Sequence, residues 1–467
     1  MESGKPYFFC GIGGSGMLPL ACIVRARGHE VAGSDRSLDQ GRLGAKFGFL
    51  ESLGIRLFDQ DGSGVTSADQ TVVTSAAIEE TVPDVVRANQ LGCARLTRPQ
   101  LLAELFNDAP IGIAVDGTSG KSTVTGMIGW ILHAAGREPT VMNGAVMKNF
   151  VSEEMPFASA LVGGGDAFVS EVDESDGSIA LYRPKVAVLN NITLDHKSLD
   201  ELRHLFRDFA SQAETIVLNL DDDETRLLAA DLPAERIVTY SFRDRGAGLF
   251  AHGAENRGEH WQTEVTDRAS GETRLMQVHT PGLHNLQNGL AAMAASMAAG
   301  LSFADAVEAL KHFEGLRRRF ERIGSARGVE VVDDFAHNPD KIAATLASAR
   351  TSETARLLLF FQPHGYGPLR IMGDALISAF VAGMGPEDGL ILSDPVYYGG
   401  TTDRSVGSGA IVEGIRAAGR TAEHIPERAR CGERLAELAR RGDRIIVMGA
   451  RDDTLSQFAA ELLDRLG

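Results

Sequence analysis

The sequence predicts an α/β protein of three consecutive domains with mainly parallel sheets. Its 467 residues suggest about three domains of ~150 residues each. Apolar stretches of strand length alternate with helical patterns, and two glycine-rich turns each stand between a strand and a helix. We expect a Rossmann-like domain at 1–106, a central P-loop domain at 107–314 and a second Rossmann-like domain at 315–467.

The composition is that of a globular protein in a reducing compartment, with 43% hydrophobic and 23% charged residues. The four cysteines are scattered and form no CxxC pair, so we expect reduced thiols. We expect no secretory signal, and the longest apolar run is shorter than the about 18 residues that a membrane span needs. The net charge of −17 argues against nucleic acid as a partner. We therefore expect a cytoplasmic monomer or homodimer that acts on small molecules and binds neither nucleic acid nor membrane.

In the first domain, strands are expected at 6–13, 29–35 and 70–78, and the first helix has Pro19 in its opening turn. The run Gly11-x-Gly13-x-x-Gly16 follows the first strand, and Asp35 comes about 20 residues later. Such a turn binds a diphosphate through backbone amides at a helix N-terminus. Taken alone, it is also compatible with a nicotinamide- or flavin-dependent dehydrogenase.

The central domain begins with a strand at 111–115, followed by a loop and a helix that ends near Gly136. That helix carries apolar residues at i, i+3, i+4, i+7 and i+8 from Val124. Further strands are expected at 167–172, 185–192 and 215–220. The polar stretch 243–280 indicates short strands and turns on the rim of this domain.

The loop before that helix reads "GTSGKST", from Gly117 to Thr123. Its glycines allow backbone amides to surround phosphate oxygens, Lys121 can neutralise the outer phosphates, and the Ser122 hydroxyl can bind Mg²⁺. Val115 stands where the strict P-loop pattern has its first glycine, so the match is to a shorter form.

Acidic and polar residues follow the next two strands. Glu171 ends one strand and is followed by three more acidic residues, of which Glu174 is one. Asn191, Asp195 and His196 follow the other strand. Ligands gather at such strand ends, and carboxylates suit Mg²⁺.

The third domain has strands expected at 328–335, 356–363, 389–395 and 443–450, and Asn338-Pro339 is expected to cap a helix. Arginines at 317–319 stand at the domain boundary, where they could form a solvated face or bind a phosphoryl group. Three strands end in polar residues, "DDFAHNP", "QPHGYG" and "SDPVYYGG", which together indicate a pocket facing the central domain.

In this order and spacing, these pieces resemble the Mur ligases of peptidoglycan synthesis. The matching stretches span nearly the whole chain: "GIGGSGM", "GSD", "VVTSAAI", "GTSGKST", "EVDESD", "NNITLDH", "HNLQNGLAA", "GLRRRFE", "DDFAHNP" and "FQPH". The resemblance implies a UDP-sugar domain, a central ATPase domain and a C-terminal ligase domain that closes over the amino acid and ATP. It is strongest to the branch that adds L-alanine to UDP-N-acetylmuramate.

The resemblance also implies roles for individual residues. Lys121, Glu171, His196 and Arg319 would be catalytic. Ser122 and Glu171 would bind one Mg²⁺ ion, and Glu171 with His196 a second. ATP would be bound by Gly117, Thr118, Ser119, Gly120, Lys121, Ser122, Thr123, His284, Asn285, Asn288, Arg319, Asp334 and His337. The UDP-sugar would be bound by Gly11, Gly13, Gly14, Ser15, Gly16, Ser34, Asp35 and Ser75, and the amino acid by His364 and Tyr366.

The mechanism that the resemblance implies is carboxylate activation. The sugar carboxylate attacks the γ-phosphate of ATP and forms an acyl phosphate, which the incoming amine then attacks. The chain departs from the alanine-adding pattern after "QPH", where it has Gly365-Tyr366-Gly367-Pro368 rather than Arg-Tyr-Thr-Arg, and after "DH". Attachment of a murein tripeptide to the same nucleotide sugar is therefore an alternative. A dehydrogenase and a non-catalytic relative are alternatives of other classes.

Overall fold

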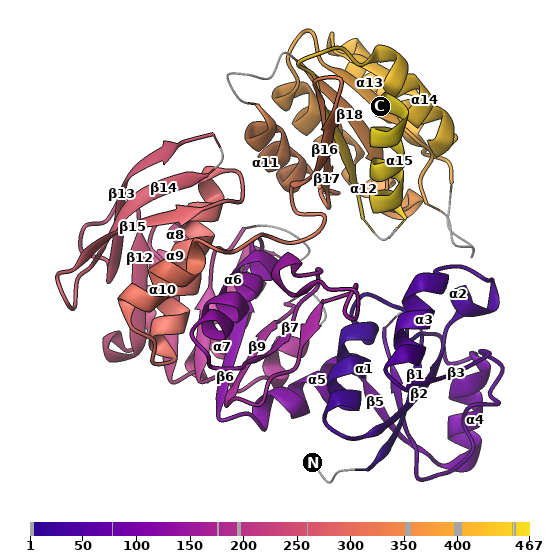
Figure 1. Cartoon of the computed structure of the whole chain (residues 1–467), viewed down its shortest axis with the longest axis vertical. Coiled ribbons are helices and arrows are strands. Elements are labelled where there is room, and N and C mark those ends of the chain that lie inside the picture. The colour runs from indigo at the N-terminus through magenta and orange to yellow at the C-terminus, as the bar shows by residue number, and fades with distance from the viewer. Residues whose placement is uncertain are drawn as a thin grey trace. The chain divides into compact units, whose positions relative to one another are not determined.

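The computed structural model describes residues 4–76, 78–174, 177–193, 198–258, 260–350, 356–396, 404–450, 452 and 454–467. The chain forms two compact units, one ending at Leu316 and the other comprising Arg317–Gly467. Within the described residues, the first unit contains two β-sheets and the second unit one (Figure 1). All three sheets are mainly parallel and are flanked by helices, which confirms the predicted fold class. The exact residues of the domain boundaries stay a prediction.

The first sheet is parallel throughout, in the order β3-β2-β1-β4-β5. The strand order reverses beside β1, and ligands of doubly wound proteins bind at the carboxyl ends of the strands at such a point. The strands are β1 (Pro6–Cys10), β2 (Glu30–Ser34), β3 (Arg56–Phe58), β4 (Thr71–Thr74) and β5 (Ala94–Thr97). The helices are α1 (Met17–Ala26), α2 (Arg36–Asp39), α3 (Gly44–Ser52), α4 (Pro83–Leu91) and α5 (Arg98–Asn107).

Side chains of β1 alternate between two apolar layers. Tyr7 and Phe9 pack with residues of α1, α3 and α5, whereas Phe8 packs against α4 on the other face. A strand buried on both faces reads as a continuous apolar run, which is why "YFFC" predicted it. Pro19 lies in the first turn of α1, as predicted.

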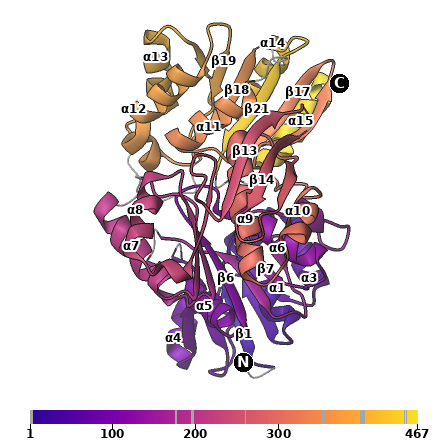
Figure 2. The same ribbon diagram turned by 90° about the vertical axis from the view of Figure 1, so that its left-hand side faces the viewer.

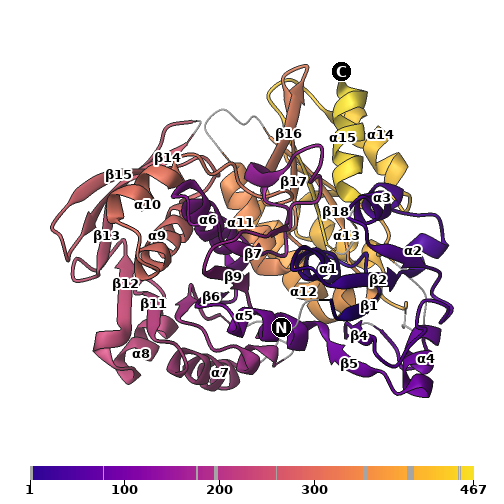
Figure 3. The same ribbon diagram turned by 60° about the horizontal axis from the view of Figure 1, so that its bottom comes forward.

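The central sheet has the order β15-β14-β13-β12-β11-β10-β6-β9-β7-β8. It is parallel from β13 to β7, and antiparallel pairing begins at β14 on one edge and at β8 on the other. The strands are β6 (Ile111–Asp116), β7 (Thr140–Met142), β8 (Ala160–Leu161), β9 (Ala167–Glu171), β10 (Val186–Leu189), β11 (Thr215–Asn219), β12 (Ile237–Ser241), β13 (Leu249–Asn256), β14 (Trp261–Asp267) and β15 (Thr273–Val278). Strands β13 to β15 form the rim predicted from residues 243–280 (Figures 1 and 3).

Helices cover both faces of the central sheet. The α-helices are α6 (Lys121–Ala134), α7 (Leu199–Ser211), α8 (Asp223–Asp231), α9 (Leu283–Ala298) and α10 (Phe303–Leu310), and the 3₁₀ turns are Lys148–Phe150, Ser178–Leu181 and Ala234–Arg236. The apolar positions predicted for α6, from Val124 to Leu132, are all buried in the same core as α9 and α10. The period of 3.6 residues therefore placed this helix and its inner face correctly.

The sheet of the second unit has the order β16-β17-β21-β18-β19-β20, antiparallel only between β16 and β17 among the described strands. The strands are β16 (Glu321–Ala326), β17 (Val329–Asp334), β18 (Leu357–Gln362), β19 (Gly389–Leu392), β20 (Thr421–His424) and β21 (Arg444–Gly449). The helices are α11 (Pro339–Ala349), α12 (Tyr366–Gly383), α13 (Ser408–Ala417), α14 (Arg428–Leu438) and α15 (Leu455–Leu466).

Strand β18 separates two apolar cores in this unit. Leu357, Leu359 and Phe361 pack with α11, α12 and α13, whereas Leu358 and Phe360 pack with α14 and α15. Figure 2 shows these two groups of helices on opposite sides of the sheet. Asn338 caps α11, as predicted, because its side-chain oxygen accepts a hydrogen bond from the Lys341 amide at 2.9 Å.

The four cysteines are free thiols in the structure, and three of them are buried. In the described part of the chain, no helix combines the length and the apolar character that crossing a bilayer requires.

Candidate active site

The second glycine loop, residues 117–120, joins β6 to α6, which is the context that the sequence predicts for a phosphate-binding loop. Gly120 has a φ of +89°, and a Cβ atom there would lie 2.6 Å from Asn190 Nδ2 and 2.6 Å from Asn288 Oδ1. Glycine is required because both the backbone conformation and these neighbours exclude a side chain. The loop therefore lies directly against the chain that follows β10 and against α9.

Polar groups after β10 hold the loop in place. Asn191 Oδ1 accepts a hydrogen bond from the Ser119 amide at 2.8 Å, and its Nδ2 donates to the Ser119 carbonyl at 3.0 Å. Thr118 Oγ1 accepts from the Thr193 amide at 2.9 Å. Asn191, which the sequence singled out as a strand-end residue, thus contacts the loop itself.

Lys121 begins α6, and its ammonium group lies between two carboxylates. Its Nζ donates to Glu174 Oε2 at 2.7 Å and lies 3.9 Å from Asp116 Oδ1. Burial lowers the pKa of Lys121, but the charges of Asp116 and Glu174 outweigh burial and raise that pKa above its ordinary value. The lysine is therefore a cation at neutral pH.

Asp116 ends β6 and is fully buried. Its Oδ1 accepts from the Gly117 amide at 2.7 Å, whereas its Oδ2 has no hydrogen-bond donor among the described residues. Burial raises the pKa of Asp116 well above its ordinary value, against the opposing charge of Lys121.

Ser122 and Glu171, which were predicted to share a Mg²⁺ ion, lie next to each other beside the loop. The Ser122 hydroxyl donates to Glu171 Oε2 at 2.7 Å. The backbone after β7 closes around this pair, because Asn143 Nδ2 donates to the Ser122 carbonyl at 2.9 Å and a Cβ atom on Gly144 would lie 2.1 Å from Glu171 Oε1. The carboxylate thus occupies space that only a glycine at 144 leaves open.

The donor set of Ser122 and Glu171 fits Mg²⁺, since this ion takes hard oxygen ligands and usually one or two carboxylates together with phosphate oxygens and waters. Among the residues that the structure describes, no group of three or more His, Cys, Asp and Glu side chains forms a metal cluster. His196, expected at a second ion, lies outside the described residues, as does Asp195.

Gly144→Ala is expected to lower the turnover of this site by about 10-fold or more, since the added methyl group must displace the Glu171 carboxylate and misplacing a catalytic group by about 1 Å can cost ~10²-fold. The rate of ADP release at several Mg²⁺ concentrations measures this effect, and we expect the Mg²⁺ requirement to rise. Gly48→Ala is the control, because Gly48 is exposed in α3 and has open space at its Cβ position. Wild-type activity in Gly144→Ala would contradict the placement of Glu171.

Three of the residues predicted at ATP, namely His284, Asn285 and Asn288, lie in the first turns of α9. Asn288 Oδ1 accepts from Asn190 Nδ2 at 2.9 Å, and Asn288 Nδ2 donates to Asn285 Oδ1 at 2.9 Å. Asn285 Nδ2 donates to the Pro281 carbonyl, at 2.6 Å, and His284 is exposed in the first turn of the helix. A chain of amides therefore connects this helix start to the phosphate-binding loop.

The first glycine loop follows β1 at the carboxyl end of its sheet. Gly14 and Ser15 are exposed ahead of α1, and the Gly14 carbonyl accepts hydrogen bonds from the Met17 and Leu18 amides at 3.0 and 2.9 Å. The Gly13 amide donates to Asp35 Oδ2 at 2.9 Å, and Asp35 Oδ1 accepts from the Ser37 amide at 2.8 Å. Asp35 thus fastens the loop to the start of α2.

The two serines predicted at the UDP-sugar differ in their surroundings. Ser75 follows β4 and is half-buried. Ser34 is fully buried, and its hydroxyl donates to Asp84 Oδ2 at 2.6 Å. Burial raises the pKa of Asp84. The Ser34 hydroxyl therefore bonds to the interior of the domain in this structure.

Two cations beside the first glycine loop were missed by the sequence analysis. Arg98, at the start of α5, lies against Gly16, where a Cβ atom would be 3.0 Å from Arg98 Cδ. Lys46 is buried in α3, and its Nζ donates to the Gly13 carbonyl at 3.0 Å. The sequence offered one sign of such a cation, namely that the basic residue Arg98 directly follows a strand.

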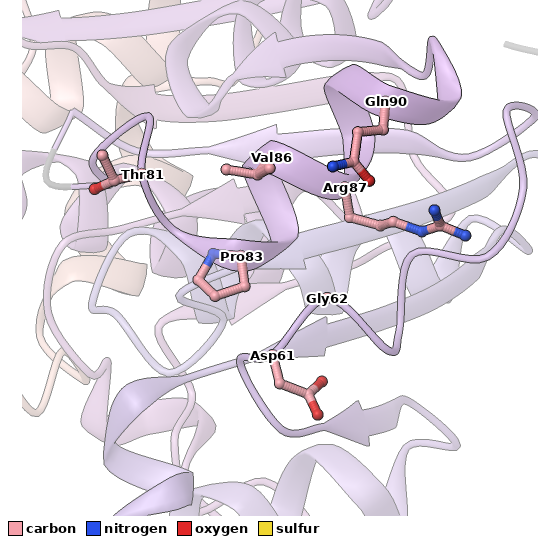
Figure 4. Close-up of a pocket in the computed structure, with 7 residues that line it drawn as sticks. All are labelled: Asp61, Gly62, Thr81, Pro83, Val86, Arg87 and Gln90. Atoms are coloured by element: carbon pink, nitrogen blue, oxygen red, sulfur yellow. The ribbon is translucent and has the colours of Figure 1, made fainter.

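A shallow cavity of about 500 Å³ lies on the first domain, between α4 and the chain after β3 (Figure 4). Its lining contains none of the residues predicted at the UDP-sugar. It is lined by Asp61, Gly62, Thr81, Pro83, Val86, Arg87 and Gln90.

In the second unit, the three arginines of the run differ in burial, and Arg317 is exposed. Arg318 is buried and donates to the Gly449 carbonyl at 2.8 Å, with its Nε 3.4 Å from Asp333 Oδ2. Arg319 is half-buried, and its guanidinium lies 4.9 Å from the centre of the Phe335 ring. Arg318 therefore supports the fold, and Arg319 is the better placed of the two to meet a ligand.

Asp334, at the end of β17, is enclosed by donors. Its carboxylate accepts from the amides of Phe320 and Ala336, at 2.7 and 2.8 Å, and from Thr345 Oγ1 at 3.0 Å. Burial of the carboxyl group raises its pKa, although the nearby Arg319 charge opposes this. Asp334 therefore fixes the turn that carries the next predicted residue, His337.

His337 lies beside His364, with the ring centres 5.0 Å apart and the rings nearly perpendicular. His337 Nδ1 donates to the Phe335 carbonyl at 2.8 Å. Tyr366 begins α12, two residues after His364. The structure thus brings the predicted nucleotide residue His337 next to His364, which was predicted at the amino acid.

Burial, together with the nearby Lys341 charge, lowers the pKa of His337 to about 3. We expect its ring to stay neutral at pH 5 in the folded protein, whereas in the unfolded chain it takes up a proton near pH ~6.5. The unfolded state then binds more protons below that pH, so this histidine lowers the free energy of unfolding as the pH falls from about 6.5 towards 3. An NMR titration of the ring, assigned with His337→Gln and repeated in urea, tests this. A midpoint near 6.5 in the folded protein would contradict it.

Comparison with known proteins identifies related domains along the whole chain. Residues 6–109 match the model of the Mur ligase family catalytic domain, residues 115–296 the Mur ligase middle domain, and residues 318–451 the Mur ligase glutamate ligase domain. These matches fall on the three sheets in order.

Relatives extend over most of the chain. The UDP-N-acetylmuramate–L-alanine ligase of a Cyanothece species is 36% identical over 424 residues, which cover 86% of this chain and 83% of the relative. The ligase of the same name from Thermosynechococcus vestitus is 34% identical and covers 87% of this chain and 85% of the relative.

Solved structures have the same fold. The UDP-N-acetylmuramate-alanine ligase of Thermotoga maritima superimposes with a TM-score of 0.78 at 22% identity, covering 98% of both chains. A murein peptide ligase of Psychrobacter arcticus has a TM-score of 0.70 at 26% identity, covering 99% of both chains. From its sequence and its fold, the chain belongs to the Mur ligase family.

Proposed function

We propose that this chain is an ATP-dependent ligase that joins the carboxylate of UDP-N-acetylmuramate to the amine of L-alanine in the synthesis of peptidoglycan precursors. The observation that carries the proposal is the 36% identity, over 86% of the chain, to a ligase named for these two substrates. The phosphate-binding loop supports it, because Lys121 and Ser122 stand at the start of α6, where ATP phosphates would bind.

In the proposed reaction, the sugar carboxylate attacks the γ-phosphorus of ATP, the bond to the β-phosphate oxygen breaks, and ADP leaves. The amine of alanine then attacks the acyl carbon, loses a proton and expels phosphate. Two anions must meet in the first step, so positive charge on the phosphates is needed. Lys121 supplies such a charge.

Ser122 and Glu171 are the residues that would hold Mg²⁺ here, which when bound neutralises charge on the phosphates. The Glu171 carboxylate lies in the space that the missing side chain of Gly144 leaves open, and it accepts a hydrogen bond from Ser122. Asn190 and Asn191 hold the loop beside the start of α6 through hydrogen bonds to the Ser119 backbone. The roles expected for His196, Arg319, Asp334 and His337 at the metal and the nucleotide stay predictions.

The first glycine loop is proposed to bind the diphosphate of the UDP-sugar. Exposed backbone at Gly14 and Ser15 ahead of α1 suits a diphosphate, and Arg98 adds a cation next to Gly16. The expectations of a cytoplasmic protein, of a monomer or homodimer and of a second Mg²⁺ ion stay predictions.

A second candidate function is attachment of a murein tripeptide to UDP-N-acetylmuramate. It is favoured by the likeness to the murein peptide ligase at 26% identity over 99% of both chains. The segment Gly365-Tyr366-Gly367-Pro368, which departs from the alanine-adding pattern, lies next to His364 at the start of α12. A change there could accommodate a larger amine substrate.

An ADP-release assay with UDP-N-acetylmuramate and a panel of amino acids and short peptides tests both candidates. The proposal expects L-alanine to give the highest kcat/KM. Release with the tripeptide and none with alanine would exclude the leading substrate and favour the second candidate. Tight binding of NAD without any ADP release would instead favour the dehydrogenase alternative.

A further inference from the structure

The cation of the phosphate-binding loop already has an anionic partner in this structure. Lys121 Nζ lies 2.7 Å from Glu174 Oε2, and the Glu174 side chain is only 7% exposed. A hydrogen bond between two charged groups at this distance is among the strong ones. The Glu174 carboxylate therefore occupies a direction from Lys121 that a phosphate oxygen would otherwise use.

A second carboxyl group lies beside the same lysine. Asp116 Oδ1 is 3.9 Å from the same ammonium group, and the Asp116 side chain is fully buried. A triphosphate that approached Lys121 without a cation of its own would meet the Glu174 carboxylate on that lysine. Like charges at short range in a buried site oppose binding more strongly than on a surface.

Glu174 and Asp116 are attached to the sheet in different ways. It follows β9 by three residues, in the chain segment that begins with Glu171, so one short segment carries both the carboxylate on Lys121 and the carboxylate on Ser122. Asp116, by contrast, ends a central strand and accepts a hydrogen bond from the Gly117 amide. Of the two acidic partners of Lys121, Glu174 is the one that a ligand can displace.

We propose that Glu174 holds Lys121 in the nucleotide-free protein by occupying the phosphate position, and that a nucleotide displaces it efficiently only when a divalent cation enters with the phosphates. The inference rests on the proposed ATP site and adds to it a positioning residue that makes nucleotide binding depend on the cation. A glutamate that merely supported the fold would not couple nucleotide affinity to the metal.

The test is calorimetric binding of a non-hydrolysable ATP analogue to the full chain, once with excess Mg²⁺ and once with EDTA. Glu174→Gln removes the charge and keeps the size of the side chain. We expect it to tighten binding in EDTA by about 10-fold or more, on the scale of one lost charged hydrogen bond, and to change binding with Mg²⁺ much less. The ratio of the affinity with Mg²⁺ to the affinity in EDTA should therefore fall.

Glu153→Gln is the matched control, because it removes the same charge from an exposed position of the same domain. We expect both of its affinities to equal those of the wild type. If Glu174→Gln does not fold, as judged by circular dichroism, Glu174→Asp shortens the side chain, withdraws the carboxylate from Lys121 and should shift the ratio in the same direction.

Affinity in EDTA that is unchanged or weaker in the folded Glu174 variant would overturn the inference. If the wild type nevertheless binds the analogue with Mg²⁺, that result would overturn only the role of Glu174 and not the proposed ATP site. A wild-type protein that binds no analogue under either condition would instead remove the proposed function together with the inference.

Discussion

Lys121→Ala is expected to reduce ligation by at least about 10²-fold, the scale of removing one preorganised charged donor from a transition state. Lys121 stands at the first position of α6, directly after the glycine loop, with its charge maintained by two carboxylates. Without it, the negative charge that develops between the sugar carboxylate and the γ-phosphate has one cation fewer. The rate of ADP release with UDP-N-acetylmuramate and L-alanine measures the effect.

Lys311→Ala is the matched control for this variant, because Lys311 pairs with exposed Glu308 at 2.5 Å in the same domain. We expect it to retain wild-type turnover. Circular dichroism should accompany Lys121→Ala, since the variant leaves Asp116 and Glu174 close together without their cation and buried charges that lose a partner are destabilising. Unchanged turnover in a folded Lys121→Ala protein would remove the loop from the proposed site.

The second large effect is expected for Glu171→Gln, which keeps the size of the side chain and removes its charge. A neutral amide binds Mg²⁺ more weakly than a carboxylate, so we expect turnover to fall by about 10²-fold and the half-saturating Mg²⁺ concentration to rise. Removal of the metal with EDTA should abolish turnover of the wild type. Measuring ADP release over a range of Mg²⁺ concentrations gives both quantities.

Glu153→Gln again controls for the loss of one negative charge and should behave as the wild type. The Mg²⁺ dependence separates Glu171 from Lys121, because Lys121→Ala should lower the rate without a comparable increase in the Mg²⁺ requirement. A Glu171→Gln protein with normal turnover and a normal Mg²⁺ requirement would contradict the assignment of the metal to Ser122 and Glu171.

Local patterns in the sequence predicted the elements that carry the site. Strands β6 and β18 are buried on both faces, so each is a continuous apolar run in the sequence. The period of 3.6 residues in the apolar positions predicted α6 and the face that it buries. The strand, glycine loop and helix at 111–134 are contiguous, so their relation to one another follows from sequence alone. The Mur ligase family could likewise be inferred from motifs in order, and the comparisons confirmed it.

The arginine run shows where sequence reasoning stopped. The three consecutive arginines cannot be told apart from their sequence. In the structure, Arg318 has a positive φ of +60°, and its side chain contacts Asp333 in the interior of the unit. Arg319 remains half-buried next to Phe335. No spacing rule distinguishes neighbours whose difference depends on backbone conformation.

Ser34 shows the same limit in the first domain. Its motif predicted a ligand contact, whereas the structure directs its hydroxyl to Asp84, 50 residues away in sequence. Arg98 was missed for the opposite reason, because its position next to Gly16 depends on α1 and α5 lying together.

The contiguous parts of this protein, namely its strands, its glycine loops and the residues at its strand ends, were determined by the sequence, because each depends on interactions within about one turn or one strand. The tertiary structure decided which strand ends meet. In the sheet order β10-β6-β9, the segments that follow β9 and β10, some 50 and 70 residues from the glycine loop in sequence, lie on either side of this loop. That order places Glu171 on Ser122, Glu174 on Lys121 and Gly144 where the Glu171 carboxylate needs room. Pairings across the sheet depend on packing and burial between distant segments, and these are properties of the folded chain.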